Sequence, residues 1–463
     1  MPTLAGRAYR CHCGRPVFFR NSRCLACNTP LGYEPHSARL LPLMPGDEPN
    51  QWQAWDDAVV AAREAAAEQE NGPADAQGEE APVPPTLSDS LPTNPSAGDQ
   101  QRPSYWRCAN LKTPAACNWL IPVTDPFGGS GLCSACRLNR TIPDLNDPAH
   151  PDNGVLWGQI ELAKRRLVSA LMALGLPVAS RLAEDPERGL MFDFLRPVNG
   201  SPIMTGHDTG LITLNLDEAD DATREAVRKA MHEPYRTLLG HFRHEVGHYY
   251  WDRLVSNTSW MDGFHQLFGD ESADYAESLR RNYEEGPPEG WQLHYVSAYA
   301  SSHPWEDWAE CWAHYLHMRD TIDTALSFGL SAANMQLEFT PFTMDALYDP
   351  EHEHAQRFLD FLNDWTQLTT MLNEMSRAMG QPDFYPFVLP REVVAKLHFI
   401  HLLVTSASWL PQDPAEACEL QNEENLAAPP GQTDTLDAEQ MIPPGDANSS
   451  ETEGEPAEAV TGH

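Results

Sequence analysis

Two histidines and a glutamate lie in one short stretch of this sequence, His244-Glu245-Val246-Gly247-His248. In a helix, residues four apart lie on the same face, so both imidazoles can bind one zinc ion. Glu245 would then lie beside the open coordination position, where a water molecule binds. Zinc lowers the pKa of such a water to about 7, and a glutamate can take its proton as it attacks a peptide carbonyl. The stretch therefore predicts a zinc hydrolase, although an HExxH pattern also arises by chance in ordinary helices.

The sequence around this motif predicts a central, buried helix. Gly240–Leu254 is amphipathic and rich in aromatic residues, with Phe242 before the motif and Tyr249, Tyr250 and Trp251 after it. A helix of this kind packs into a core, which would hold the two histidines in fixed positions. The context favours a zinc site over a chance occurrence of the motif.

A second stretch, Val296–His317, is able to supply the third protein ligand. Its tryptophans recur at helical spacing, and core packing alone explains them. Glu306 and Glu310 lie four residues apart on another face of the same predicted helix. A catalytic zinc site has three protein ligands, and a carboxylate can be one of them. The spacing alone leaves both glutamates as candidates.

Four cysteines near the start of the chain form a first predicted metal site. Cys11, Cys13, Cys24 and Cys27 follow the pattern CxC, ten residues, CxxC. In a reducing compartment, such a group favours metal binding over disulfides. The first pair is one residue shorter than the usual CxxC, so His12 could replace Cys11 as a ligand. We expect a closed structural zinc site.

A second group of four cysteines follows after a long interval. Cys108, Cys117, Cys133 and Cys136 end in a CxxC pair, with looser spacing before it. We predict a second closed four-thiolate zinc site. A closed site has no open coordination position, so we assign both clusters to structure or partner binding and not to catalysis.

Composition divides the chain into five predicted segments. The formal net charge is −36, and much of it lies in two acidic stretches that are rich in Pro, Ala, Glu and Gly. Such composition is typical of disordered chain. The predicted organisation is a four-cysteine ribbon at 1–45, an acidic disordered linker at 46–101, a second four-cysteine segment at 102–150, a metallopeptidase domain at 151–410 and an acidic disordered tail at 411–463.

The charge also bears on partners and location. An acidic chain repels nucleic acid, so no nucleic-acid partner is expected. The first ribbon is nevertheless locally basic, which predicts a solvated basic face or one that docks the acidic linker; its arginines are Arg7, Arg10, Arg15, Arg20 and Arg23. We expect no signal peptide and no membrane span, because no apolar run is long enough. The expected location is the cytoplasm.

The remaining patterns predict an α+β fold. Leu190–Leu195 and Gly210–Leu216 are expected to be strands, and most of the later chain is expected to be helical. A strand at the edge of the sheet above the zinc could pair with an extended substrate backbone. We therefore predict a mainly helical, zincin-like domain with a small sheet, preceded by small zinc-ribbon modules.

These residues resemble the gluzincins, metallopeptidases whose third zinc ligand is a glutamate on a later helix. The chain is more closely similar to a bacterial family of zinc-binding metallopeptidases with an N-terminal zinc-ribbon domain. The resemblance spans roughly residues 9–404 and rests on RCHCGRPVFFRNSRCLACNTPLGY, CNWLIP, CRLNRTIPDLNDP, FRHEVGHYYWDRL, FGDESADYAE and HPWEDWAE.

The segment AYASSHPWEDWAE is also similar to the catalytic end of anthrax lethal factor, where a tyrosine seven residues before the glutamate ligand faces the zinc. This resemblance implies that Tyr299 faces the zinc and that Glu306 is the third ligand. Glu310 would then lie behind the histidine ligands. If the register is different, Glu310 becomes the ligand.

Together these observations predict a zinc-dependent metallopeptidase with one catalytic and two structural zinc ions. His244, His248 and Glu306 would hold the catalytic ion, with Glu245 as general base and Tyr299 as a donor to the oxyanion. The expected partners are a peptide or protein substrate and a protein bound through the ribbons. Two alternatives remain: an adaptor protein whose HExxH domain is a scaffold, and a zinc hydrolase acting on a non-peptide amide.

Overall fold

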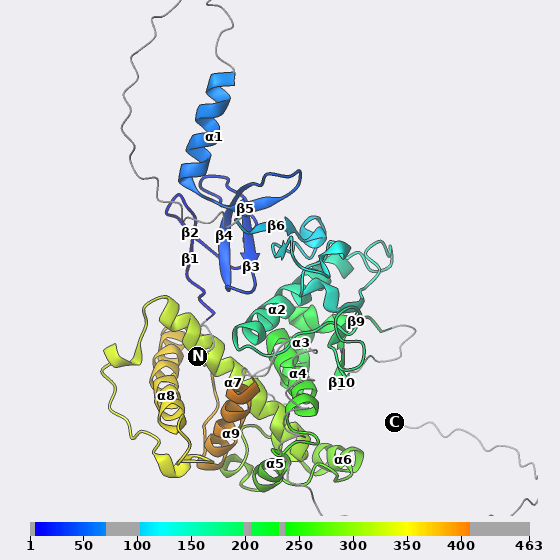
Figure 1. The fold of residues 1–463 in the computed structure, drawn as a ribbon. Coiled ribbons are helices and arrows are strands. Elements are labelled where there is room, and N and C mark those ends of the chain that lie inside the picture. Colours follow the sequence, from blue (N-terminus) through cyan, green and yellow to red (C-terminus); the bar gives the residue numbers. More distant parts are fainter. Residues whose placement is uncertain (1–4, 71–101, 198–202, 204, 231–236, 408–463) are drawn as a thin grey trace, which may run out of the picture. The chain divides into compact units, whose positions relative to one another are not determined.

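A computed structural model describes residues 5–70, 102–197, 203, 205–230 and 237–407 (Figure 1). Helices dominate these residues, and three small sheets accompany them, which confirms the predicted α+β class. None of the described helices is both long enough and apolar enough to cross a membrane.

The N-terminal part is built on one five-stranded antiparallel sheet, in the order β3-β4-β5-β6-β7. Strands from the regions of both cysteine clusters lie in this sheet, because Trp52 of β5 pairs with Tyr105 of β6. The two clusters therefore share one structural module. Its elements are β1 (Tyr9–Arg10), β2 (Pro16–Val17), β3 (Leu31–Glu34), β4 (Arg39–Pro45), β5 (Trp52–Ala54), α1 (Asp57–Glu70), β6 (Ser104–Arg107) and β7 (Leu120–Pro122).

Part of the predicted disordered linker is structured. Residues 46–70 include β5 and α1, and the amide of Gln53 donates hydrogen bonds to Asp47 and Ser104. Trp55 stacks on His12 with ring centroids 3.9 Å apart. Acidic composition had suggested disorder here, but strand pairing and these contacts hold the segment. The rest of the linker and the tail at 411–463 lie outside the described residues.

The later part combines a four-stranded sheet, in the order β10-β11-β9-β8, with a set of helices. The expected strands correspond to β9 and β11, and both lie inside the sheet. Its two edge strands are β10 and β8, which the sequence did not predict. Its elements are β8 (Asn139–Thr141), α2 (Asn153–Ala173), β9 (Met191–Leu195), β10 (Gly206–Asp208), β11 (Leu211–Asn215), α3 (Asp221–Ala230), α4 (Leu238–Leu254), α5 (Met261–Phe268), α6 (Tyr275–Glu285), α7 (Pro304–Ser327), α8 (Ala355–Ala378) and α9 (Arg391–Ala407).

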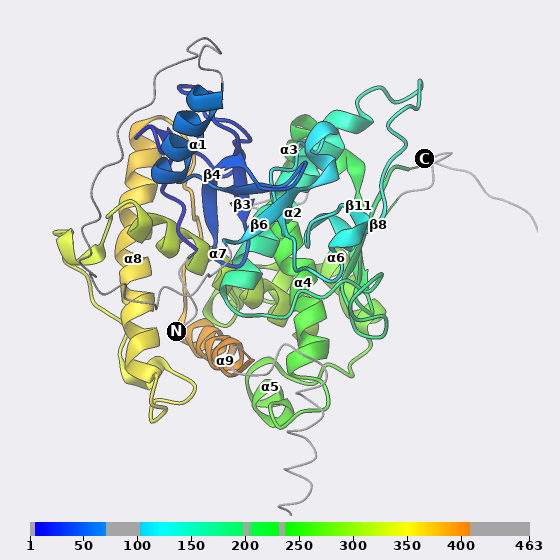
Figure 2. The ribbon, with the colours of Figure 1, turned by 45° about the horizontal axis from the view of Figure 1, so that its top comes forward.

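Helices α4 and α7 form the centre of this part. α7 lies between α4 on one side and α8 and α9 on the other (Figures 1 and 2). Gly247 permits the close packing of α4 on α7, since a Cβ atom there would lie 3.0 Å from the Cα of Ala309. Trp308 donates its indole N–H to the carbonyl of Gly247 at 2.8 Å, and Trp312 stacks on Tyr250. Trp308 and Trp312 of the predicted stripe thus pack in the core and fix α4 against α7.

Candidate zinc centre

The HExxH motif lies on α4, as the sequence predicts. The side chain of Thr237 caps this helix by accepting a hydrogen bond from the backbone N–H of Gly240. His244 and His248 project from one face toward the first turn of α7. There, Glu306 Oε2 lies 2.9 Å from His244 Nε2, and Glu306 Oε1 lies 3.6 Å from His248 Nε2. His244 and His248 are four positions apart in sequence, and Glu306 follows them by 62 and 58 positions. The structure brings these three residues together.

The chemistry of these donors fits a zinc ion. One ligand atom from each of the three residues lies within 4.8 Å of the other two. Glu306 Oε2 is buried and makes no hydrogen bond among the described residues, although His244 Nε2 is close to it. Two imidazole nitrogens and one carboxylate oxygen form the donor set of many catalytic zinc sites, with a fourth position left open. The three residues could hold the ion in this way.

Glu310 has a different position, behind His244. Its Oε1 lies 2.8 Å from His244 Nδ1, and its Oε2 accepts a hydrogen bond from the Ser297 hydroxyl at 2.6 Å. A carboxylate that accepts a hydrogen bond from Nδ1 fixes the orientation of a metal-binding imidazole and leaves Nε2 for the metal. This geometry favours Glu306 over Glu310 as the third ligand.

Glu245 and Tyr299 lie next to the ligands. Burial raises the pKa of Glu245 above its ordinary value, and the neighbouring histidines oppose that rise only in part. A carboxylate with a raised pKa is better matched to proton transfer near neutral pH. The ring of Tyr299, from the turn before α7, lies 5.9 Å from the ring of His244. Both side chains thus lie near the candidate ligands, and their roles in catalysis stay predictions.

Sequence reasoning missed Tyr275, the first residue of α6. Its hydroxyl donates a hydrogen bond to Glu306 Oε1 at 2.6 Å, and 39% of its surface is exposed. Asp274 caps α6 by accepting from the N–H of Glu277, which fixes the helix start beside the ligand. The segment FGDESADYAE contains this tyrosine. Tyr275 is 31 positions from Glu306 in sequence, so no local pattern indicates the contact.

His207 and Trp305 also line the site without having been predicted for it. His207, on the edge strand β10, has its ring 6.2 Å from that of His248. Trp305 had been assigned to core packing, yet its ring lies 4.2 Å from that of His248 and it is only partly buried. The edge strand and one tryptophan of the stripe thus belong to the surroundings of the metal ligands.

The sulfur atoms of each predicted cysteine cluster also converge, all within 4.8 Å of one another. In the first cluster, Cys11 Sγ lies 3.5 Å from Cys27 Sγ, so Cys11 takes part in the cluster. His12 lies beside it instead, with Nε2 2.8 Å from the Thr29 hydroxyl and 3.7 Å from Cys27 Sγ. The exposed Cys13 completes this site together with Cys24.

All four cysteines of the second cluster are buried. Arg165 lies beside them and donates a hydrogen bond to the carbonyl of Ala115 at 2.9 Å. Burial opposes the charge of this guanidinium, but the thiols and Glu161 outweigh burial and raise its pKa. A buried cation beside four thiolates offsets their negative charge around a zinc ion.

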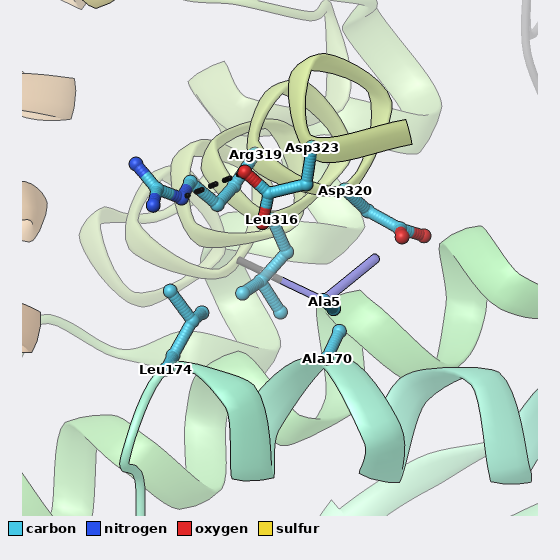
Figure 3. Close-up of a pocket in the computed structure, with 7 residues that line it drawn as sticks. All are labelled: Ala5, Ala170, Leu174, Leu316, Arg319, Asp320 and Asp323. Atoms are coloured by element: carbon cyan, nitrogen blue, oxygen red, sulfur yellow. Dashed lines mark ion pairs between the residues drawn. The ribbon is translucent and has the colours of Figure 1, made fainter. Parts of the chain in front are cut away.

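The ribbon and the HExxH helix meet at one buried carboxylate, Asp320 of α7. It accepts hydrogen bonds from Arg7 of the ribbon, Arg166 of α2 and Arg243, which directly precedes His244. Ala5 lies between α2 and α7, where it lines a small gap of about 10 Å³ together with Asp320 (Figure 3). Asp320 thus links the N-terminal segment to the helix that carries the candidate ligands.

Comparison with known proteins identifies the family of the chain. Residues 153–403 match the family described as "Putative zinc-binding metallo-peptidase". Residues 8–72 and 87–147 match a "zinc-ribbon domain", which therefore includes both cysteine clusters. The chain belongs to this family of zinc-binding metallopeptidases with an N-terminal zinc ribbon.

Relatives are found in mycobacteria. Uncharacterized proteins of Mycobacterium bovis and Mycobacterium tuberculosis are each 46% identical over 299 residues, which cover 64% of this chain and 82% of the relative. No solved structure matches the chain.

Proposed function

We propose that the chain is a zinc-dependent metallopeptidase whose ion is held by His244, His248 and Glu306. The observation that carries this proposal is the convergence of two imidazoles and a buried carboxylate beside Glu245. A zinc ion bound there would supply a Lewis acid for the scissile carbonyl and an acidified water. In this proposal the two cysteine clusters hold one structural zinc ion each.

In this proposal the protein residues around the ion have separate roles in the reaction. Glu245 takes a proton from the attacking water and later returns it to the leaving amine. Tyr299 donates a hydrogen bond to the oxyanion of the tetrahedral intermediate. Tyr275 and Glu310 are positioning residues, since they hold Glu306 and His244 through hydrogen bonds.

The edge strand β10 supports a peptide substrate over other amides. Among the described strands it pairs with β11 alone, so its outer edge could pair with an extended chain. Its His207 lies beside His248, which places this edge at the candidate ligands. An extended peptide that pairs with β10 would run past the zinc site.

Glu245 is buried, and unlike the buried Asp320 it forms no ion pair with a lysine or arginine among the described residues. Burial of a carboxylate in an apolar interior costs free energy, and here it also raises the pKa of the group. A role as general base accounts for a buried carboxylate at this position despite its cost in free energy. We therefore favour an enzyme over an adaptor protein.

The test is digestion of a diverse peptide mixture by the zinc-loaded protein, read by mass spectrometry. Wild type is expected to produce new termini, and a chelator is expected to abolish them. Glu245→Gln keeps the size of the side chain and should keep zinc, but turnover should fall by about 10²–10⁴-fold. Cleavage by Glu245→Gln at the wild-type rate would contradict the proposed role of this residue.

A further inference from the structure

A large groove lies between the first ribbon, α2 and the C-terminal end of α7. Its volume is about 1060 Å³. The residues of α2 that line it recur at i, i+3, i+4 and i+7, which is one face of that helix. The groove is lined by residues 15–21 and 24–26 and Arg7 of the ribbon, by Gln159, Leu162, Ala163 and Arg166 of α2, and by Thr324 and Phe328.

Large apolar side chains in this lining are exposed. Leu25, at the turn between two cysteines of the first cluster, is 96% exposed. Phe18 is 63% exposed and Phe328 is 60% exposed. These three side chains come from separate segments that meet at one groove, and large apolar groups that gather on a surface mark an interaction site.

The charges in the groove all have one sign. Its lining contains four arginines and no acidic residue. Arg7 and Arg166 are engaged by Asp320. Arg15 and Arg20 are exposed, and no carboxylate of the described chain forms an ion pair with either of them. In a chain with a net charge of −36, this groove is a positive region suited to an acidic occupant.

We propose that this groove binds a polypeptide segment of a partner protein that combines carboxylates with large apolar side chains. The carboxylates would pair with Arg15 and Arg20, and guanidinium–carboxylate pairs have favourable bidentate geometry. The apolar side chains would cover Leu25, Phe18 and Phe328. The net charge of −36 on the whole chain repels nucleic acid, which favours a polypeptide as the occupant.

The groove is separate from the candidate zinc centre. Glu306 lies in the first turn of α7 and Phe328 follows its last residue, so the helix separates them by about 33 Å. An occupant of the groove would leave the zinc centre accessible. The inference therefore stands independently of the proposed peptidase activity.

The test measures binding of a fluorescein-labelled peptide, in which glutamates alternate with leucines and phenylalanines, by fluorescence anisotropy. The protein is the full chain with Glu245→Gln, so that cleavage does not interfere. Two control peptides replace the glutamates by glutamine or the apolar residues by serine. We expect both controls to bind at least about tenfold more weakly, and binding of the test peptide to weaken with added salt.

Matched variants test whether the peptide binds in the groove. Arg20→Glu and Phe328→Ser are expected to weaken binding of the test peptide by about tenfold or more. Arg39→Glu, an exposed arginine of the ribbon outside the groove, and Leu326→Ser, an exposed residue of α7 outside it, are expected to leave binding unchanged. All four side chains are exposed, so circular dichroism should show retained folding.

Three results would overturn the proposal. The first is equal binding of the test and control peptides. The second is an equal effect of the groove variants and their matched controls. The third is tighter binding of oligodeoxythymidine in the same groove, which would assign the surface to single-stranded nucleic acid.

Discussion

The candidate catalytic centre and the cysteine clusters use different numbers of protein donors. His244, His248 and Glu306 offer three donors, with Glu245 and Tyr299 beside them. Each cysteine cluster offers four thiols and is closed by its own residues. A site with three protein ligands keeps a position for water or substrate, whereas a site with four does not. Under the proposed function, one chain would use the same metal for chemistry and for structure.

The two cysteine clusters also differ from each other, although strands of one sheet join them. The second cluster is wholly buried beside Arg165, whereas Cys13 of the first is exposed. The first cluster lies at the groove with Leu25, and the second lies against α2. The first cluster, through its exposed Cys13, is therefore suited to contacts outside the chain, and the second cluster is suited to support of the fold.

Removal of one thiol from the buried cluster should have the largest effect. Cys133→Ser leaves three buried thiols without a complete site, and structural zinc contributes about 10–16 kcal/mol to the folding of small zinc domains. We expect loss of one zinc ion and unfolding of the ribbon at lower temperature. Zinc analysis and thermal unfolding measure both effects.

Cys13→Ser is the matched variant in the first cluster. Water can take the place of the exposed thiol, so a smaller loss of stability is expected. Equal destabilisation by the two variants would contradict the distinction between the clusters.

A second prediction concerns Asp320, which links the two kinds of site. Asp320→Asn would leave Arg7, Arg166 and Arg243 without their shared carboxylate. Breaking a buried ion pair by loss of one partner typically costs about 3–5 kcal/mol of unfolding free energy. Chemical denaturation measures this difference.

The ionisation of Asp320 should also make the free energy of unfolding depend on pH. Burial opposes ionisation of Asp320, but its three arginines outweigh burial and hold its pKa well below the ordinary value. Its contribution to stability is therefore complete above the unfolded-state pKa of about 4 and is lost as the pH falls below it. This acid-dependent loss should be smaller in Asp320→Asn.

Asp323 is the control for this prediction, since it is buried one turn away on the same helix (Figure 3). Burial raises its pKa to about 6, and among the described residues its ion pair is with Arg319 alone. Because the folded state disfavours its charge, Asp323→Asn should leave the free energy of unfolding at pH 7 unchanged or increase it. A larger loss in Asp323→Asn than in Asp320→Asn would be incompatible with the proposed link.

The last predictions concern Tyr299 and Tyr275, the two tyrosines beside the candidate zinc ligands. Tyr299→Phe removes a donor to the oxyanion, so turnover should fall by about 10²–10³-fold while zinc affinity stays the same. Tyr275→Phe removes the hydrogen bond to Glu306 and should weaken zinc binding or activity by about 10–100-fold. Steady-state kinetics and competition with a zinc chelator separate the two roles. Unchanged turnover in Tyr299→Phe would remove that residue from the reaction.

The sequence was most informative where a local pattern carries the chemistry. Helical spacing of His244 and His248 and the CxxC pairs predicted side chains that the structure brings together. The resemblance then favoured Glu306, and the structure places Glu306, not Glu310, beside both Nε2 atoms.

Features that depend on distant parts of the chain were not predictable in this way. Strand β10 has three residues, too few for a periodic pattern, and Tyr275 reaches a ligand 31 positions away. Arg7 and Asp320 are 313 positions apart. No local pattern indicates a contact of this kind, because it is decided by how the helices pack.

The most direct test of the comparison is a crystal structure with anomalous scattering measured at the zinc absorption edge. We expect one zinc ion in each of the three clusters. The ion on α4 should be bound by His244, His248 and Glu306, with a non-protein oxygen in the remaining position, and the other two should each be bound by four sulfurs. A fourth protein ligand on the α4 ion, ligation by Glu310 in place of Glu306, or no metal at the two histidines would contradict the account.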